Sequence, residues 1–490
     1  MRTFLIILFT FLLPLSYSLA EKARPNIIYI MTDDQRWDTF GCYGRPEFQT
    51  THIDKLAKEG VIFDNVYFAV SICAPSRATV MTGRYFASHQ SGFSYPFNRR
   101  LTKEDFDNTY PAIFKNAGYR TGFIGKFGMF TERGGVKSEN YFDYYAVRGR
   151  FIPKDDKELA HIYRKERDPK ERTLKKGDAM IHFLDSQPKD KPFCLSVSFD
   201  AVKNNRDEDM YGPHTAIFEN KTMSVPQNWV EGMNKKMPEV VQKYARGYRL
   251  HKTETSTPAL YQKVARRFAT QGYTVDQQVA RLMKKLKEMN VLDNTIIIYT
   301  SDNGRFHGSH GLFSKALLYD DVMKAPFIVY DGRVAKRKRG YRESALVSFV
   351  DIAPTIIAMA GLEIPESMQG RDFSNILNKT QDRNTWRDYV FMENLFIEEI
   401  FKARIKGVED LDEVNTQIIE GNRSYRSRGV RNTKYKYFVY YEQHPAIEEL
   451  YDLSKDPQEM NNVAHDPSYK KVLVQLREKT EDLYQKHKQE

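Results

Sequence analysis

Apolar stretches that alternate with helical patterns limit the fold of this chain more than any other feature of its sequence. Each stretch is continuously apolar, which is typical of strands buried on both faces of a parallel sheet. The helical patterns between them suit the crossover connections that a parallel sheet requires. The sequence therefore predicts an α/β fold, with a mostly parallel central sheet flanked by helices. The strand candidates lie within 25–35, 110–128, 191–200, 293–304 and 325–333.

Polar side chains follow several of these strand candidates directly. Asp33 and Asp34 end the first, Lys126 follows the second, and Asp302 and Asn303 end the strand within 293–304. Ligand sites of such sheets lie beyond the carboxyl ends of the strands. We therefore expect these five side chains to converge at one edge of the sheet, although they are far apart in sequence.

The two polar pairs, Asp33–Asp34 and Asp302–Asn303, suggest a metal site. Three carboxylates and an amide oxygen brought together would repel one another unless a hard cation lay between them, and oxygen ligands favour calcium or magnesium over zinc. Each pair alone also fits the ordinary role of a strand-end aspartate in a cap or turn. Spacing by itself leaves the two interpretations evenly balanced.

The segment 71–84, SICAPSRATVMTGR, contains Cys73, one of only three cysteines. A helix that begins near Pro75 and ends near Gly83 would place Cys73 at its N-terminus, where free N–H groups and the helix dipole favour an anion. Arg77 would lie one turn into this helix. A buried structural thiol and a thiolate nucleophile are both open interpretations. Neither explains the Pro-Ser-Arg that follows the cysteine.

The motif CAPSRATVMTGR resembles the signature of the type I sulfatases, Cys-x-Pro-Ser-Arg followed by Thr-Gly-Arg. The resemblance extends through NIIYIMTDDQRWDTFGCYG, GYRTGFIGKFG, IIIYTSDNGRFHGSHGLFSKALLYDD and ELYDLSKDPQEMNN. It implies an alkaline-phosphatase-like sheet with a smaller α+β C-terminal subdomain. It also implies a sulfuric ester hydrolase whose signature cysteine, here Cys73, a maturation enzyme oxidises to formylglycine.

The resemblance also implies roles for the site residues. Calcium would be held by a set that includes the modified Cys73, and the ion would also bind a sulfate oxygen. Arg77 would steady the hydrated aldehyde, while Lys126 and Lys315 would pair with sulfate oxygens. Ser76 and Thr82 would belong to the maturation signature and the helix rather than to catalysis. The calcium ligands would be Asp33, Asp34, Cys73, Asp302 and Asn303.

Two departures from the family pattern concern the acid that protonates the leaving alcohol. Gly128 stands where the family commonly has a site histidine, and Lys203 takes the place of a second one. A lysine among cations can have a lowered pKa and donate a proton, or it can bind substrate charge. His214 and His310 are alternative acids, whereas His307 fits a surface loop equally well.

Residues 1–20 form a short apolar run after one arginine, with small residues at its end. This pattern predicts a cleaved signal peptide, with a membrane anchor as the less favoured alternative. We therefore expect a secreted or periplasmic protein with no membrane attachment after cleavage. The predicted organisation is a signal peptide at 1–20, a catalytic domain at 21–375 and a C-terminal subdomain at 376–490.

The net charge of +11 suits a polyanionic substrate, although solubility alone explains it almost as well. Nucleic acid is excluded as a partner, because an exported chain without a nucleic-acid-binding module does not suit it. The polar and aromatic segment 204–261 favours a sulfated carbohydrate over a small aryl ester. A phosphatase or phosphonate hydrolase, and a degenerate protein that binds sulfated glycan without cleaving it, are the rival functions.

The three cysteines of the chain are too few and odd in number for disulfides to hold the fold together. Cys42 and Cys194 could pair, but two buried free thiols suit their apolar surroundings better.

Overall fold

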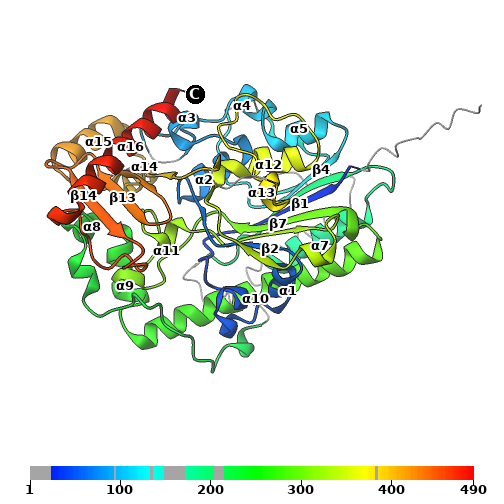
Figure 1. Ribbon diagram of the computed structural model, residues 1–490, viewed down its shortest axis with the longest axis horizontal. Helices are drawn as coiled ribbons and strands as arrows, with labels where there is room; N and C mark the ends of the chain where they lie inside the picture. Colours follow the sequence, from blue (N-terminus) through cyan, green and yellow to red (C-terminus); the bar gives the residue numbers. More distant parts are fainter. Residues whose placement is uncertain are drawn as a thin grey trace, which may run out of the picture.

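An eight-stranded sheet forms the centre of the protein, in the order β5-β4-β6-β1-β7-β8-β2-β9 (Figure 1). The computed structural model describes residues 24–92, 95–132, 136–147, 172–203, 214–380 and 385–489. The predicted signal peptide and residues 204–213 of the segment 204–261 lie outside the described residues. The strands are β1 (Asn26–Thr32), β2 (Val61–Phe63), β4 (Arg120–Gly125), β5 (Tyr144–Val147), β6 (Phe193–Ser198), β7 (Thr295–Ser301), β8 (Phe327–Asp331) and β9 (Tyr341–Glu343).

Alternate side chains of β1 face two separate apolar cores, one on each side of the sheet. Ile27, Tyr29 and Met31 belong to one core, whereas Ile28 and Ile30 belong to the other. The period-two alternation of a strand thus buries every residue of β1, which explains its continuously apolar sequence. The first core is covered by α2 (Cys73–Thr82), α5 (Tyr110–Asn116) and α12 (Ile352–Met359), and the second by α1 (Thr51–Lys58), α7 (Arg172–Asp185) and α10 (Pro258–Glu288).

The expectation of a mostly parallel sheet is confirmed, with β8 as the exception. β1 runs parallel to both β6 and β7, but β8 is antiparallel to β7 and to β2. A parallel neighbour would require a crossover that returns the chain to the other edge of the sheet. Between β7 and β8 the chain forms only loops and short helices such as α11 (Asp320–Met323), so β8 starts at the edge where β7 ends.

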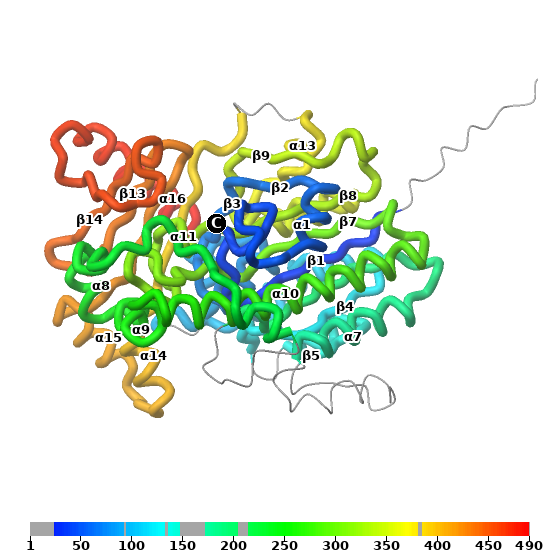
Figure 2. Tube along the Cα trace, turned by 90° about the horizontal axis from the view of Figure 1, so that it is seen from below, coloured from blue at the N-terminus to red at the C-terminus, as the bar shows by residue number. Residues whose placement is uncertain are grey.

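A second, antiparallel sheet makes up the core of the C-terminal subdomain, in the order β11-β12-β13-β14. The long helix α16 (Lys470–Gln489) packs on it through Leu476, in a core that includes Val430, Tyr437 and Leu450. In Figures 1 and 2 this sheet lies on the side of the molecule toward which β1 runs. The α+β character of the subdomain is thus confirmed, whereas the exact domain boundaries stay predictions. Its strands are β11 (Val390–Asn394), β12 (Ser427–Arg431), β13 (Tyr435–Tyr440) and β14 (Ile447–Asp452).

Shorter elements connect these layers. The strands β3 (Val66–Tyr67) and β10 (Val347–Ser348) form a small parallel pair. The remaining helices are α3 (Phe86–His89), α4 (Lys103–Asp107), α8 (Glu239–Tyr244), α9 (Arg246–Glu254), α13 (Ser374–Leu377), α14 (Glu398–Ile405) and α15 (Leu411–Glu420). No helix among the described residues is both long and apolar enough to cross a membrane.

The three cysteines are all free thiols. Cys194 lies in β6 and belongs to the core on the α2 face, whereas Cys42 packs against the core on the α10 face. The sheet therefore separates the two thiols, which excludes the disulfide between them and agrees with the expectation of free thiols.

Candidate active site

The helix α2 places Cys73 at the carboxyl edge of the central sheet. Ile72, immediately before it, has extended backbone, and the helix runs from Cys73 to Thr82 and ends at Gly83, whose φ is 63°. This left-handed conformation suits glycine at the C-terminal end of a helix. The predicted helix is therefore present, and its first residue is the signature cysteine.

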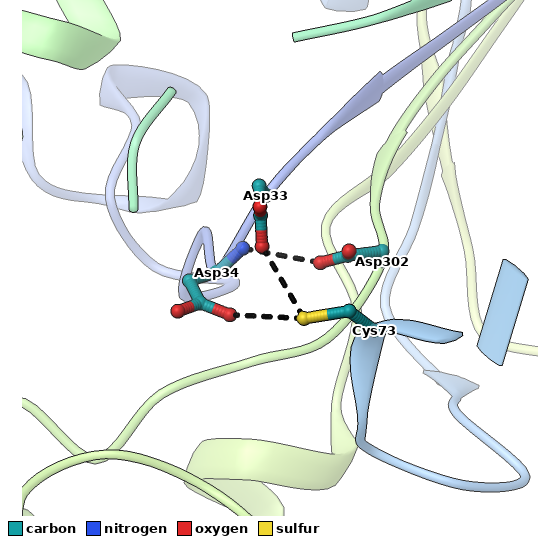
Figure 3. Close-up of side chains that lie close together, drawn as sticks. All are labelled: Asp33, Asp34, Cys73 and Asp302. Carbon is teal, nitrogen blue, oxygen red and sulfur yellow. Dashed lines mark hydrogen bonds between the residues drawn. The ribbon is translucent and has the colours of Figure 1, made fainter. Parts of the chain in front are cut away.

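Asp33 and Asp34 follow β1, and Asp302 follows β7, so adjacent parallel strands deliver three carboxylates to one place (Figure 3). One ligand atom from each of these residues and from Cys73 lies within 4.8 Å of the others, and all four residues are buried. The Cys73 Sγ atom lies 3.5 Å from Asp33 Oδ1 and 3.9 Å from Asp34 Oδ1. The Asp34 amide donates a hydrogen bond of 3.1 Å to Asp302 Oδ1.

The amide of Asn303 completes this group. Asn303 Nδ2 donates to Asp34 Oδ1 at 2.7 Å, and Asn303 Oδ1 accepts from Lys315 Nζ at 2.8 Å. Asn303 therefore provides an oxygen atom beside the three carboxylates. This donor set, made of carboxylate and amide oxygens, fits a hard divalent cation such as calcium.

Several cations surround the carboxylates. Arg77 donates to Asp302 Oδ2 at 2.9 Å, and it also bonds to the Lys126 carbonyl and to Ser198 at the end of β6. Lys126 pairs with Asp33. Lys315 pairs with Asp34 and donates to Cys73 Sγ. The site therefore presents several cationic donors around one buried sulfur atom, an arrangement that suits a small, highly charged anion.

Burial and charge set the protonation of this cluster. Burial acts to raise the pKa of Asp34, but Lys315 and Arg305 outweigh it and hold the pKa well below its usual value. Burial and the neighbouring Asp302 raise the pKa of Asp33. The part of this rise that comes from Asp302 is repulsion between carboxylates, which a cation between them would relieve.

The Cys73 thiol has a raised pKa, because burial and then the carboxylates of Asp302 and Asp33 disfavour the thiolate. A cysteine that acts as a plain nucleophile needs a lowered pKa. This environment therefore disfavours the thiolate nucleophile that the sequence left open. It is compatible with a cysteine whose function depends on chemical modification.

Lys203 lies within reach of the cluster, with Nζ 3.7 Å from Asp33 Oδ2 and 37% of its side chain exposed. Gly128 borders the same space. Its φ is 68°, and a Cβ atom there would lie 3.0 Å from Arg77 Cδ and 3.5 Å from Lys126 Cε. No side chain therefore enters the site from position 128, and Lys203 is the more exposed of the two lysines beside Asp33.

The histidines considered as alternative acids make their contacts elsewhere. His310 is fully buried, and its Nε2 lies 3.2 Å from Asn228 Nδ2 and 3.3 Å from Asp321 Oδ2. His214 hydrogen-bonds to Thr274 on α10. None of the contacts given by the structure joins either ring to the carboxylate cluster.

His307 is buried against Phe268, with ring centroids 4.0 Å apart, so it is not a surface loop residue. Arg305 and Ser198 contact the site but were not among the predicted residues. Ser198 could have been suspected from its place at the end of β6, whereas no sequence signal directs the Arg305 side chain toward Asp34.

Comparisons with known proteins agree with this geometry. The family model described as Sulfatase matches residues 25–362, and that of N-sulphoglucosamine sulphohydrolase, C-terminal, matches residues 420–486. The chain is 29% identical to an N-acetylglucosamine-6-O-sulfatase of Bacteroides thetaiotaomicron, over 95% of this chain and 87% of that protein. It is 27% identical to an ulvan-active sulfatase of Formosa agariphila, over 94% and 80% respectively.

Solved structures show the same fold. One, determined in complex with its substrate D-glucosamine-2-N,6-O-disulfate, matches with a TM-score of 0.73 and 26% identity over 95% of this chain and 98% of that one. A phosphonate monoester hydrolase of Agrobacterium radiobacter matches with a TM-score of 0.72 at 21% identity, over 95% and 96%, which shows a shared fold.

Fold and site together define an alkaline-phosphatase-like hydrolase that acts on sulfuric esters. Within that class, the match over 25–362 settles the family. The chain belongs to the type I sulfatases.

Proposed function

We propose that this protein is an exported, calcium-dependent sulfatase that removes sulfate from a sulfated carbohydrate through formylglycine at position 73. The observation that carries the proposal is the position of Cys73: buried at the start of α2, beside three carboxylates and in contact with Lys315. A thiol with a raised pKa in this place is a poor nucleophile but the right precursor for the family's aldehyde.

Calcium would be held by the side chains of Asp33, Asp34, Asp302 and Asn303, together with the group derived from Cys73. The ion would supply charge compensation for a sulfate oxygen next to the attacked sulfur. Formylglycine, when hydrated, would supply one hydroxyl that attacks sulfur and a second whose deprotonation releases the sulfate.

The cations of the site would orient the sulfate group. Burial acts to lower the pKa values of Lys126 and Lys315, but Asp33 and Asp34 respectively outweigh it, so both pKa values are raised and both side chains are cationic at neutral pH. They would bind the sulfate oxygens and stabilise the charge that develops on them. Arg77, held by Asp302 and Ser198, would steady the hydroxyls at position 73.

Lys203 would protonate the leaving alcohol. A sugar alkoxide is a poor leaving group, and Lys203 is the more exposed of the two lysines beside Asp33, with 37% of its side chain exposed against 21% for Lys126. We assign the acid to Lys203 rather than His310, because His310 is buried between Asn228 and Asp321. His214, which contacts Thr274, is the remaining alternative.

A sulfated carbohydrate is the substrate class that the relatives favour. Two of them are named for N-acetylglucosamine 6-O-sulfate and for ulvan, and a structure of similar fold holds a disulfated glucosamine. The net charge of +11 supports a polyanionic partner. Release of sulfate from defined sulfated oligosaccharides would identify the sugar. Turnover of phosphonate monoesters alone would favour the phosphonate hydrolase. Turnover of neither substrate class would favour the non-catalytic glycan-binding protein.

The calcium site can be tested with Asp302→Ala. Removal of this carboxylate leaves the ion undercoordinated and also removes the partner of Arg77. We expect loss of bound calcium, measured by elemental analysis, and loss of nearly all sulfate-ester turnover. Asp331→Ala is the control, because Asp331 ends β8 and pairs with Arg333 rather than with the cluster. An Asp302→Ala protein with normal calcium content and rate would show that the aspartate is structural.

A further inference from the structure

Arg305, two residues beyond Asn303, directs a buried guanidinium at the candidate metal site. Its side chain is 7% exposed, and its Nη1 atom donates to Asp34 Oδ2. Asp34 is its one carboxylate partner among the residues that the structure describes.

Two aromatic rings fix the position of this guanidinium. Its central carbon lies 5.6 Å from the ring centroid of Phe268 on α10 and 4.7 Å from that of Phe313. Such cation–π contacts stabilise a desolvated cation and restrict its orientation. The side chain is therefore a rigid donor held between α10 and the loop that contains Phe313.

The surroundings of Arg305 make a purely structural role costly. Its guanidinium is almost fully buried and lies against the two aromatic rings, away from bulk water. Its Nε atom is buried without a hydrogen-bond partner. A cation in such a place requires a compensating anion. Asp34 is that anion, so the position of Arg305 is coupled to that of the carboxylate.

The two oxygens of Asp34 have different partners. Oδ1 faces the centre of the cluster, where it accepts from Asn303 and Lys315 and lies 3.9 Å from Cys73 Sγ. Oδ2 accepts from Arg305. The backbone of Asp34 has a φ of 63°, a left-handed conformation that is uncommon for residues other than glycine. Arg305 thus holds one oxygen so that the other points inward.

We propose that Arg305 is a positioning residue, which fixes the Asp34 carboxylate from outside the metal site so that Oδ1 is presented to the ion. This inference rests on the calcium site of the proposed function and adds a residue that neither the signature motif nor the carboxylate cluster includes. Partners that orient a metal ligand in this way typically contribute ten- to a hundred-fold to metal affinity.

The test is the calcium affinity of the full-length protein after chelation, measured by isothermal titration calorimetry. Arg305→Met keeps the length of the side chain and its contact with the two rings but removes the donors, and we expect a ten- to hundred-fold weaker affinity. Arg305→Lys, which keeps a cation, should recover part of the loss. Arg267→Met is the matched control: it removes another buried arginine, on α10 beside Phe268, that pairs with Glu254. Its calcium affinity should stay at the wild-type value.

The outcomes separate this inference from the proposed function. Wild-type calcium binding with an unchanged or tighter affinity in Arg305→Met would overturn the positioning role alone. A wild-type protein that binds no calcium would overturn the calcium site and the positioning role together. If Arg305→Met does not fold, Arg305→Lys decides: weaker calcium affinity at an unchanged melting temperature of the metal-free protein supports the role, and wild-type affinity contradicts it.

Discussion

Lys203, the proposed acid, is the residue whose effect on catalysis should depend most on the leaving group of the substrate. Positioned acid catalysis contributes about a hundred- to ten-thousand-fold when the leaving group needs a proton, as a sugar alkoxide does. An aryl leaving group is stable as an anion and needs that proton far less. We therefore expect Lys203→Ala to reduce kcat for a sulfated sugar by about this factor and to leave kcat for an activated aryl sulfate nearly unchanged.

The control for this comparison is Lys189→Ala, since Lys189 is an exposed lysine that precedes β6 at the opposite end of that strand. Steady-state kinetics on both substrates provide the readout. A rise in KM for the sugar alone would make Lys203 a binding cation. An equal loss of kcat on both substrates would argue against the acid role, and no effect on either would return that role to His214.

The sequence could predict which residues gather at the site, but not how each side chain points. Asp33, Asp34 and Asp302 end buried strands, so the geometry of a parallel sheet brings them together wherever the loops run. His310 also follows β7, yet its backbone has a φ of 57° and its ring contacts Asn228 and Asp321. Such contacts depend on packing between distant segments, which spacing in the sequence does not encode.

At the scale of single elements, the end of β4 determines where Lys126 lies. Gly125 precedes Lys126 with a φ of 96°, and a Cβ atom there would lie 2.0 Å from the Ser198 carbonyl oxygen. Because that contact is with backbone, the strand end itself must shift. We expect Gly125→Ala to destabilise the protein by more than the roughly 1–2 kcal/mol of left-handed strain and to reduce turnover by displacing Lys126.

Gly118→Ala is the control that introduces left-handed backbone strain without a steric clash. Gly118 has a φ of 85° but nothing within 4 Å of its Cβ position. Thermal unfolding and sulfate-ester turnover of the two variants should show a smaller loss of stability and normal turnover for Gly118→Ala. Equal stability and equal turnover in both variants would mean that β4 does not position Lys126.

The contact between α1 and α10 introduces a pH dependence of stability. Asp276 on α10 accepts hydrogen bonds from the backbone amides of His52 and Ile53 in the first turn of α1, and burial raises its pKa to about 7. Because the folded protein holds this proton more tightly than the unfolded chain, its stability falls as pH rises from about 4 to about 7. Asp276→Asn keeps the acceptor and removes the charge.

We therefore expect Asp276→Asn to raise the melting temperature by a few degrees at pH 8 and to leave it nearly unchanged at pH 4. Differential scanning calorimetry at both pH values is the measurement. The same shift at both values would mean that ionisation of Asp276 carries no penalty.

The direction of β8 shows what the sequence could not predict about elements. Its apolar sequence identifies it as a buried strand, but parallel and antiparallel strands at such a position bury the same residues. The direction depends on the connection from β7, and the loops between the two strands give no helical crossover. The antiparallel C-terminal sheet was easier to predict, because its tyrosine- and valine-rich strand and its final helix were visible as patterns.

At the scale of the whole molecule, the C-terminal subdomain packs next to the edge of the central sheet where Cys73 lies. Ile72 before Cys73 and Ala316 after Lys315 share an apolar cluster with Phe396 of the C-terminal subdomain. The subdomain therefore borders the active site directly. Its contribution to the shape of the substrate-binding surface depends on these tertiary contacts, whereas the proposed reaction depends on Cys73 and its neighbours.

The state of residue 73 in active protein tests this account most directly. Protein produced together with a formylglycine-generating enzyme should be digested, and the peptide that contains residue 73 examined by mass spectrometry while sulfate-ester turnover is measured on the same preparation. We predict an aldehyde in place of the Cys73 thiol, in a fraction that rises in proportion to turnover. Full turnover by protein that carries only the unmodified thiol would contradict the account.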